Sequence, residues 1–124
     1  MAKKKILIVD DEVSITKLLK IALERSGRYE VQCEAEGLKA LAAAQSFGPD
    51  LLLLDVNLPD ASGGEISAAF QEDPVLKKIP IIFLTGMISQ EEVQSGVTIG
   101  GRLALAKPID LAKLAESLEK LLPE

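Results

Sequence analysis

The chain has 124 residues, of which 48% are hydrophobic, 27% are charged and only 3% are aromatic, and its net charge is −5. This profile fits one globular domain with an aliphatic core. It argues against nucleic-acid binding, which needs basic surfaces. Histidine is absent and Cys33 is the single cysteine, so imidazole chemistry and an internal disulfide are excluded.

The chain also lacks the features of a membrane or exported protein. Its fully apolar runs, such as 51–54, are far too short to span a bilayer. Three lysines near the start lead directly into a strand-like segment rather than into a secretory signal. We therefore expect a cytoplasmic protein that does not bind membranes.

Apolar periodicity switches repeatedly between strand-like and helical patterns. The run 6–9 predicts a buried strand, and a helix over about 14–26 follows, ending before Gly27. Its predicted inner face consists of Ile15, Leu18, Leu19, Ala22 and Leu23. The next predicted elements are a strand at 29–33, a helix at 37–46, a strand at 51–54, a helix at 65–72 and a strand at 81–84.

The last third of the chain is less regular. A weak helix is predicted from Gln90, capped by Ser89, with glycines crowding its end. A strand follows at 103–106, and Asp110 is suited to cap a final helix. The predicted inner face of that helix consists of Leu111, Leu114, Leu118 and Leu121.

Five strand–helix repeats predict an α/β fold with an open parallel sheet wound on both faces. In such sheets ligands bind beyond the carboxyl ends of the strands, so the residues that follow each strand matter most. Here these residues are Asp10, Asp11 and Glu12 after the first strand, Asp55 after the third, Thr85 and Gly86 after the fourth, and Lys107 and Pro108 after the fifth.

Carboxylates brought together in one crevice repel one another unless a cation lies among them. Mg²⁺ suits oxygen ligands of this kind, and Mn²⁺ is the alternative. The amine of Lys107 and the hydroxyl of Thr85 complete a cradle for a phosphoryl group. A carboxylate can act there as the nucleophile and form an acyl phosphate.

Four segments in this order resemble the receiver domains of response regulators in two-component signalling: 6–12 (ILIVDDE), 54–60 (LDVNLPD), 82–86 (IFLTG) and 106–108 (AKP). The resemblance extends over almost the whole chain, so we expect residues 1–124 to form one receiver domain. It implies a five-stranded, doubly wound sheet with the flavodoxin-like strand order 2-1-3-4-5.

The resemblance also implies roles for individual residues. Asp55 would be the phosphoacceptor, and Asp11 and Asp55 would bind Mg²⁺ directly. Asp10 would assist through water, and the backbone carbonyl of Asn57 would be a further ligand. The phosphoryl group would then be bound by Thr85 and Lys107, and Pro108 would follow a cis peptide bond.

Two positions depart from the family pattern. Ala104 stands where the family usually has the Tyr or Phe that rotates inward on activation. Gly86 stands where alanine is more usual. These departures put the usual output route in question, but they leave the phosphorylation chemistry unaffected.

Each motif also has an ordinary structural interpretation, as an acidic helix start, a strand end or a solvated charge. The structural interpretation would require four independent coincidences at four strand ends, so the functional interpretation is favoured. A haloacid-dehalogenase-type hydrolase would need an acid at position 57, where this chain has Asn57. A dinucleotide-binding module would need G-x-G-x-x-G after a strand, and this motif follows none of the predicted strands. A pseudo-receiver that binds partners without phosphorylation is the third alternative.

The expected partners follow from the receiver interpretation. A histidine kinase or phosphotransfer protein would phosphorylate the chain, as in a phosphorelay. Its output would pass to a downstream protein or to a fused output domain. The expected output surface comprises the fourth helix, the fifth strand and the fifth helix, including Leu103. Asn57 and Met87 flank the site and are expected to influence the lifetime of the phosphoryl group.

Overall fold

The computed structural model describes residues 3–86, 98–99 and 102–122. Six strands of this part of the chain form one sheet in the order β2-β1-β3-β4-β6-β5. They are β1 (Lys4–Val9), β2 (Tyr29–Glu34), β3 (Leu51–Asp55), β4 (Ile81–Thr85), β5 (Thr98–Ile99) and β6 (Arg102–Ala106). The first five in the spatial order are parallel, which confirms the predicted order 2-1-3-4-5, with β6 as the fifth parallel strand.

The sixth strand was not predicted. β5 pairs antiparallel with β6 and extends the sheet at that edge. It has only two residues, which is too short to produce a period-2 pattern in the sequence. The helix predicted from Gln90, with Ser89 as its cap, lies outside the described residues.

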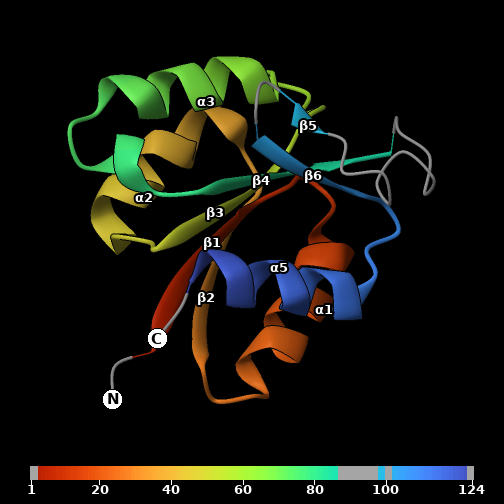
Figure 1. The fold of residues 1–124 in the computed structure, drawn as a ribbon. Coiled ribbons are helices and arrows are strands. Elements are labelled where there is room, and N and C mark those ends of the chain that lie inside the picture. Colours follow the sequence, from red (N-terminus) through yellow and green to blue (C-terminus); the bar gives the residue numbers. More distant parts are fainter. Residues whose placement is uncertain (1–2, 87–97, 100–101, 123–124) are drawn as a thin grey trace.

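Helices cover both faces of the sheet (Figure 1). On one face lie α1 (Val13–Glu24) and α5 (Leu111–Leu121), and on the other lie α2 (Ala40–Phe47) and α3 (Gly63–Glu72). Two short 3-10 turns, η1 (Gly37–Lys39) and η2 (Leu76–Lys78), precede α2 and β4. None of the described helices is long and apolar enough to cross a membrane.

The central strands β1, β3 and β4 are buried because each face of the sheet carries its own apolar layer. In β1, Ile6 and Ile8 face α1 and α5, whereas Leu7 and Val9 face α2 and α3. All four residues of the run 51–54 are fully buried. Continuous apolar runs, rather than alternating ones, are therefore what this doubly covered sheet requires.

The predicted inner faces of two helices were partly wrong. Leu18 of α1 is 67% exposed, and Leu111 and Leu121 of α5 are 50% and 38% exposed. In α1 the sheet is contacted by a narrower stripe that includes Leu19 and Leu23. In α5 the exposed leucines lie in the first and last turns, where less of the core covers them. The buried residues of this helix region are Leu114, Leu118 and Leu122.

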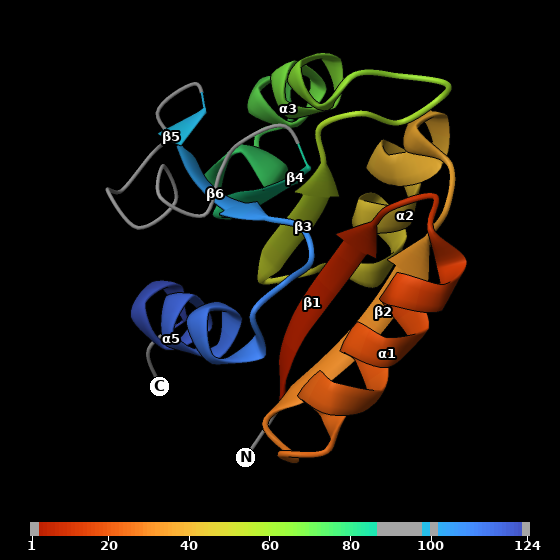
Figure 2. The same ribbon diagram turned by 90° about the vertical axis from the view of Figure 1, so that its right-hand side faces the viewer.

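The register of the sheet aligns the strand ends that carry the candidate site. Val9 pairs with Leu54, and Thr85 pairs with Ala106. Figure 2 shows β1 and β3 pointing toward the same edge of the sheet. The residues that follow these strands consequently meet at one edge.

Helix α3 begins very close to the end of β3. Its N-cap is Ser62, whose Oγ accepts a hydrogen bond from the backbone N–H of Glu65, so the helix starts two residues earlier than predicted. A Cβ atom added at Gly63 would lie 3.0 Å from Cα of Val56 and 3.3 Å from the backbone oxygen of Asp55. Glycine at this position therefore permits the close approach of α3 to the segment that follows Asp55.

We expect Gly63→Ala to destabilise the protein by about 1–3 kcal/mol, because the backbone of the adjoining segment would have to move. Gly64→Ala is the matched control, since a Cβ there would lie 3.9 Å from its nearest neighbour, Oγ of Ser62. The control should be neutral or stabilising by up to about 1 kcal/mol. Urea denaturation measures both variants, and equal stability of the two would contradict this account of α3.

Candidate functional site

Three carboxylates meet at the carboxyl edge of the sheet. Asp10 and Asp11 follow β1, and Asp55 is the last residue of β3. One ligand oxygen from each lies within 4.8 Å of the other two. Asp10 and Asp55 are buried, whereas Asp11 is exposed, so the cluster opens to solvent on one side. The structure therefore brings together the three acidic side chains that the sequence placed at one site.

Lys107 lies among these carboxylates. Its Nζ is 2.8 Å from Oδ2 of Asp10, 2.8 Å from Oε1 of Glu12 and 3.3 Å from Oδ2 of Asp55. The Lys107 side chain is only 13% exposed. The backbone of Lys107 is held in place because its N–H donates to the carbonyl of Thr85 at 2.8 Å. This bond continues the pairing of β6 with β4.

Burial and charge shift the pKa values of the two central groups. Burial raises the pKa of the Asp55 carboxyl above its ordinary value, and the charge of Asp10 raises it further. The backbone N–H of Asn57 and the ammonium of Lys107 act in the opposite direction but do not cancel this rise. For Lys107, burial lowers the pKa, but the contacts with Asp10 and Glu12 outweigh it and raise the pKa, so the ammonium stays charged.

One oxygen in the cluster has no hydrogen-bond partner among the described residues. Oδ1 of Asp10 accepts a hydrogen bond from the backbone N–H of Glu12 at 2.9 Å. Oδ2 is buried and has no partner with hydrogen-bond geometry among the described residues, although Nζ of Lys107 is at ion-pair distance. A buried carboxylate oxygen in this state is costly. Its position beside two further carboxylates fits a hard divalent cation.

The segment after Asp55 folds back over its carboxylate. The backbone N–H of Asn57 donates to Oδ1 of Asp55 at 3.1 Å, and Asn57 pairs with Ser62 in an isolated bridge. The N–H of Gly63 donates to the carbonyl of Val56. This local structure fixes the orientation of the Asp55 carboxyl and keeps the Asn57 backbone at the site.

Asp60 ties the same segment to η1, which precedes α2 on the same face of the sheet. Its carboxylate accepts hydrogen bonds from the backbone N–H groups of Gly37 (3.0 Å) and Leu38 (2.9 Å) in η1. These bonds, that of Leu38 above all, lower the pKa of the Asp60 carboxyl. The sequence pattern indicates only a turn residue at Asp60. One sequence feature could have indicated the role of Asp60 as a cap. Glu36, just before η1, is a poor N-cap, so the capping group of η1 has to come from another segment.

Thr85, the last residue of β4, is buried at the same edge. A Cβ at the neighbouring Gly86 would meet no described atom within 4 Å, so none of the described residues excludes an alanine there. The structure thus gives no steric reason for glycine at this departure from the family pattern. Met87 lies outside the described residues.

Ala104 is fully buried in β6 beside its β4 partner Phe83. Both side chains belong to the apolar layer under α2 and α3. The large Phe83 ring and the small Ala104 side chain therefore pack as neighbours. Leu103 is partly buried and packs against the opposite layer, so its substitution would disturb the core as well as any surface.

The Lys107–Pro108 peptide bond is cis. Beyond it, Pro108 and Ile109 lead into α5, whose N-cap Asp110 accepts hydrogen bonds from the backbone N–H groups of Ala112 and Lys113. The segment thus runs directly from the site residue Lys107 into a capped helix.

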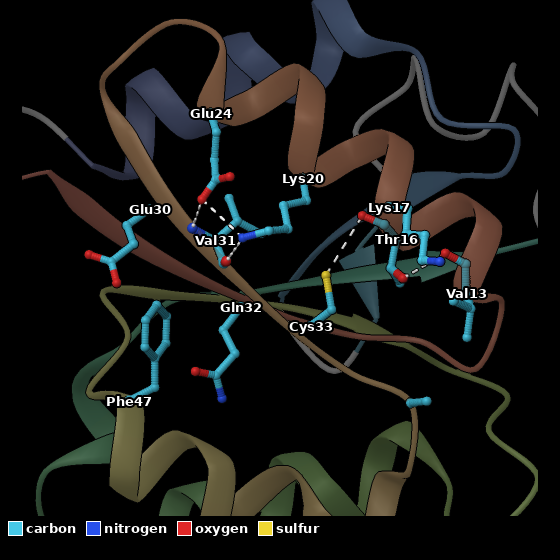
Figure 3. Close-up of a pocket in the computed structure, with 11 residues that line it drawn as sticks. Val13, Thr16, Lys17, Lys20, Glu24, Glu30, Val31, Gln32, Cys33 and Phe47 are labelled. Atoms are coloured by element: carbon cyan, nitrogen blue, oxygen red, sulfur yellow. Dashed lines mark hydrogen bonds and ion pairs between the residues drawn. The ribbon is translucent and has the colours of Figure 1, made fainter.

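A cleft of about 790 Å³ lies along the outer edge of β2, between α1 and the end of α2 (Figure 3). There Lys20 donates to the carbonyl of Val31 at 2.6 Å, and Glu24 accepts from the N–H of Val31 at 3.0 Å. The ion pair of α1 thus closes the edge of the sheet at this point, a usual protection of edge strands. Burial raises the pKa of the Cys33 thiol in the same cleft, which disfavours the reactive thiolate.

Comparison with known proteins places this geometry in a family. The family model described as the response regulator receiver domain matches residues 6–119. The chain is 33% identical over 122 residues to the polar-differentiation response regulator DivK of Brucella ovis, covering 96% of both proteins. The crystal structure of chemotaxis protein CheY4 of Vibrio cholerae is similar, with a TM-score of 0.83 and 36% identity over 98% of this chain and all of that one.

A longer relative matches equally well. The chain is 37% identical over 118 residues to the transcriptional regulatory protein TrcR of Mycobacterium tuberculosis. The match covers 95% of this chain but 45% of TrcR, so the chain spans about half the length of that relative. The family therefore includes proteins that this chain matches throughout and proteins that it matches in part.

We expect Lys107→Met to lower the free energy of unfolding by about 1–3 kcal/mol at neutral pH, because Asp10 and Asp55 would lose their compensating charge. The loss should shrink as pH falls into the acid range, where the Asp55 carboxyl, whose pKa is raised by burial, takes up a proton. Lys120→Met is the control, since Lys120 is 74% exposed in its pair with Glu116. Urea denaturation across pH tests this, and a pH-independent loss would contradict the electrostatic explanation.

Proposed function

Since the chain belongs to the family of response regulator receiver domains, we propose that Asp55 accepts a phosphoryl group from a histidine kinase or a phosphotransfer protein. The observation that carries this proposal is the position of Asp55. Its carboxylate is buried at the carboxyl edge of the sheet, contacts Lys107 and lies beside Asp10 and Asp11.

In the proposed transfer, an oxygen of Asp55 attacks the phosphorus of the donor's phosphohistidine. A P–O bond forms while the donor's P–N bond breaks, and the imidazole keeps the electron pair and takes up a proton. The ammonium of Lys107 is close enough to neutralise charge on the transferred oxygens. Thr85, at the end of the neighbouring strand, supplies a hydroxyl that can bind the phosphoryl group.

The carboxylates of Asp10, Asp11 and Asp55 fit Mg²⁺ or Mn²⁺, with Asp11 and Asp55 as direct ligands and Asp10 acting through water. The backbone carbonyl of Asn57 would add a further oxygen ligand. When bound, such a cation would neutralise the repulsion among the carboxylates and the charge of the phosphoryl group. Oδ2 of Asp10, which is buried and has no partner with hydrogen-bond geometry among the described residues, supports this assignment.

Residues 1–124 would form one receiver domain, acting in the cytoplasm, where histidine kinases obtain ATP. Its phosphorylation would change a surface that binds a downstream protein or a fused output domain. The relatives are compatible with either output. The chain matches almost all of DivK, as a domain that acts on a separate protein would, and only about half of TrcR, which is longer. The proposed output surface includes the helix predicted from Gln90, which lies outside the described residues.

The donor would dock beside the site. An apolar groove of about 230 Å³ between α1 and α5 is lined by Lys107 together with Ile15, Leu18, Pro108 and Leu111, among others. Lys107 thus borders both the groove and the carboxylate cluster. A helix of the donor that covers the exposed Leu18 and Leu111 would bring its phosphohistidine close to Asp55.

Incubation with Mg²⁺ and acetyl phosphate should add one phosphoryl group per chain, detected by intact mass. The uptake should disappear in Asp55→Ala, which lacks the nucleophile, and in the presence of a chelator. Uptake that persists in Asp55→Ala would assign the acceptor to another residue. No uptake by the wild-type chain under any condition would favour a pseudo-receiver that only binds partners.

Leu18→Ala should slow transfer from a phosphorylated histidine kinase that serves the wild-type chain by about five- to tenfold, because an apolar contact of the complex is lost. Uptake from acetyl phosphate should stay unchanged, since that donor is too small to need the groove. Leu38→Ala is the control, because Leu38 is 75% exposed but lies in η1, away from α1 and α5. Equal rates for both variants would rule out this docking face.

A further inference from the structure

Glu12 contacts Lys107 but has no role in the site described so far. Its Oε1 accepts a hydrogen bond from Nζ at 2.8 Å, which is shorter than the 3.3 Å contact of Nζ with Asp55. Glu12 occupies the N-cap position of α1, yet its side chain accepts no hydrogen bond from that helix. The helix therefore does not account for the position of this carboxylate, whereas the contact with Lys107 does.

An ammonium group has three N–H donors. Among the described residues, the neighbours of the Lys107 ammonium are three carboxylates: Glu12 and Asp55 accept hydrogen bonds from Nζ, and Oδ2 of Asp10 lies at ion-pair distance. A phosphoryl oxygen attached to Asp55 would compete with these carboxylates for Nζ. The three carboxylates differ in how easily they can be released.

Asp10 is fully buried, and its other oxygen is held by the backbone N–H of Glu12. Asp55 is the residue that would carry the phosphoryl group. The Glu12 side chain is 50% exposed, so water can solvate its carboxylate when it leaves Lys107. Of the three contacts, the one with Glu12 is therefore the least costly to break.

We propose that Glu12 is a positioning residue that competes with the phosphoryl group on Asp55 for Lys107. The inference rests on the proposed function of Asp55. In the unphosphorylated chain Glu12 holds Lys107 toward the start of α1. After phosphorylation, Lys107 moves to the phosphoryl oxygens and Glu12 turns to solvent. Glu12 thus weakens the phosphoryl-bound arrangement and makes it easier to reverse.

The test uses beryllofluoride with Mg²⁺, a non-covalent stand-in for the phosphoryl group, titrated into the full chain and followed by NMR. Glu12→Gln keeps the size of the side chain and removes its charge. We expect about two- to fivefold tighter binding in this variant, in keeping with the strength of a half-exposed ion pair. Glu116→Gln, which removes an exposed acid of α5, should bind as the wild type does.

A double-mutant cycle separates competition for Lys107 from simple repulsion between Glu12 and the anion. In a Lys107→Met background, Glu12→Gln should leave the affinity for beryllofluoride unchanged. If Glu12→Gln tightens binding equally in both backgrounds, the charge acts directly on the anion and the inference is wrong.

Two further outcomes distinguish this inference from the function on which it rests. Equal affinities of the wild type and Glu12→Gln, with normal phosphoryl uptake on Asp55, would overturn the role of Glu12 and leave the proposed function intact. Failure of the wild-type chain both to bind beryllofluoride and to take up phosphoryl would overturn the proposed function and this inference with it.

Discussion

The site depends on charge compensation around Lys107. Asp10 and Asp55 are buried close together, and two such carboxylates would repel each other strongly without a cation between them. Lys107, which follows β6, supplies that charge and makes ion pairs with both. One ammonium faces the carboxylates of Asp10, Glu12 and Asp55, so this compensation is incomplete. The site is therefore arranged to attract further positive charge, as the proposed function requires.

The sheet makes this arrangement possible. Its central strands are buried on both faces, so their ends are rigidly positioned, and the parallel register brings those ends to one edge. The segment after Asp55 is then held from two sides. Gly63 allows α3 to approach it closely, and Asp60 binds it to η1. The phosphoacceptor candidate thus lies between a fixed strand and a tethered segment.

The surroundings of Ala104 show how the core adapts to a departure from the family pattern. Phe83, its partner in β4, occupies the apolar layer in which Ala104 also lies. Aromatic volume is thus present next to position 104 in a buried strand. A rotating aromatic at position 104 cannot transmit a signal in this chain, so any output must depend on other groups near the site.

The sequence by itself determined the fold class and the residues at the strand ends, because continuous apolar runs and helical periodicity reflect local burial. The strand order 2-1-3-4-5 came from the resemblance to receiver domains. Asp10, Asp55 and Lys107 were placed at one edge because the carboxyl ends of parallel strands meet there. Tertiary structure alone decided which apolar residues of α1 and α5 are exposed, that Asp60 caps η1 and that Glu12 binds Lys107. These features depend on contacts between segments far apart in the chain, and no local pattern in the sequence encodes such distances.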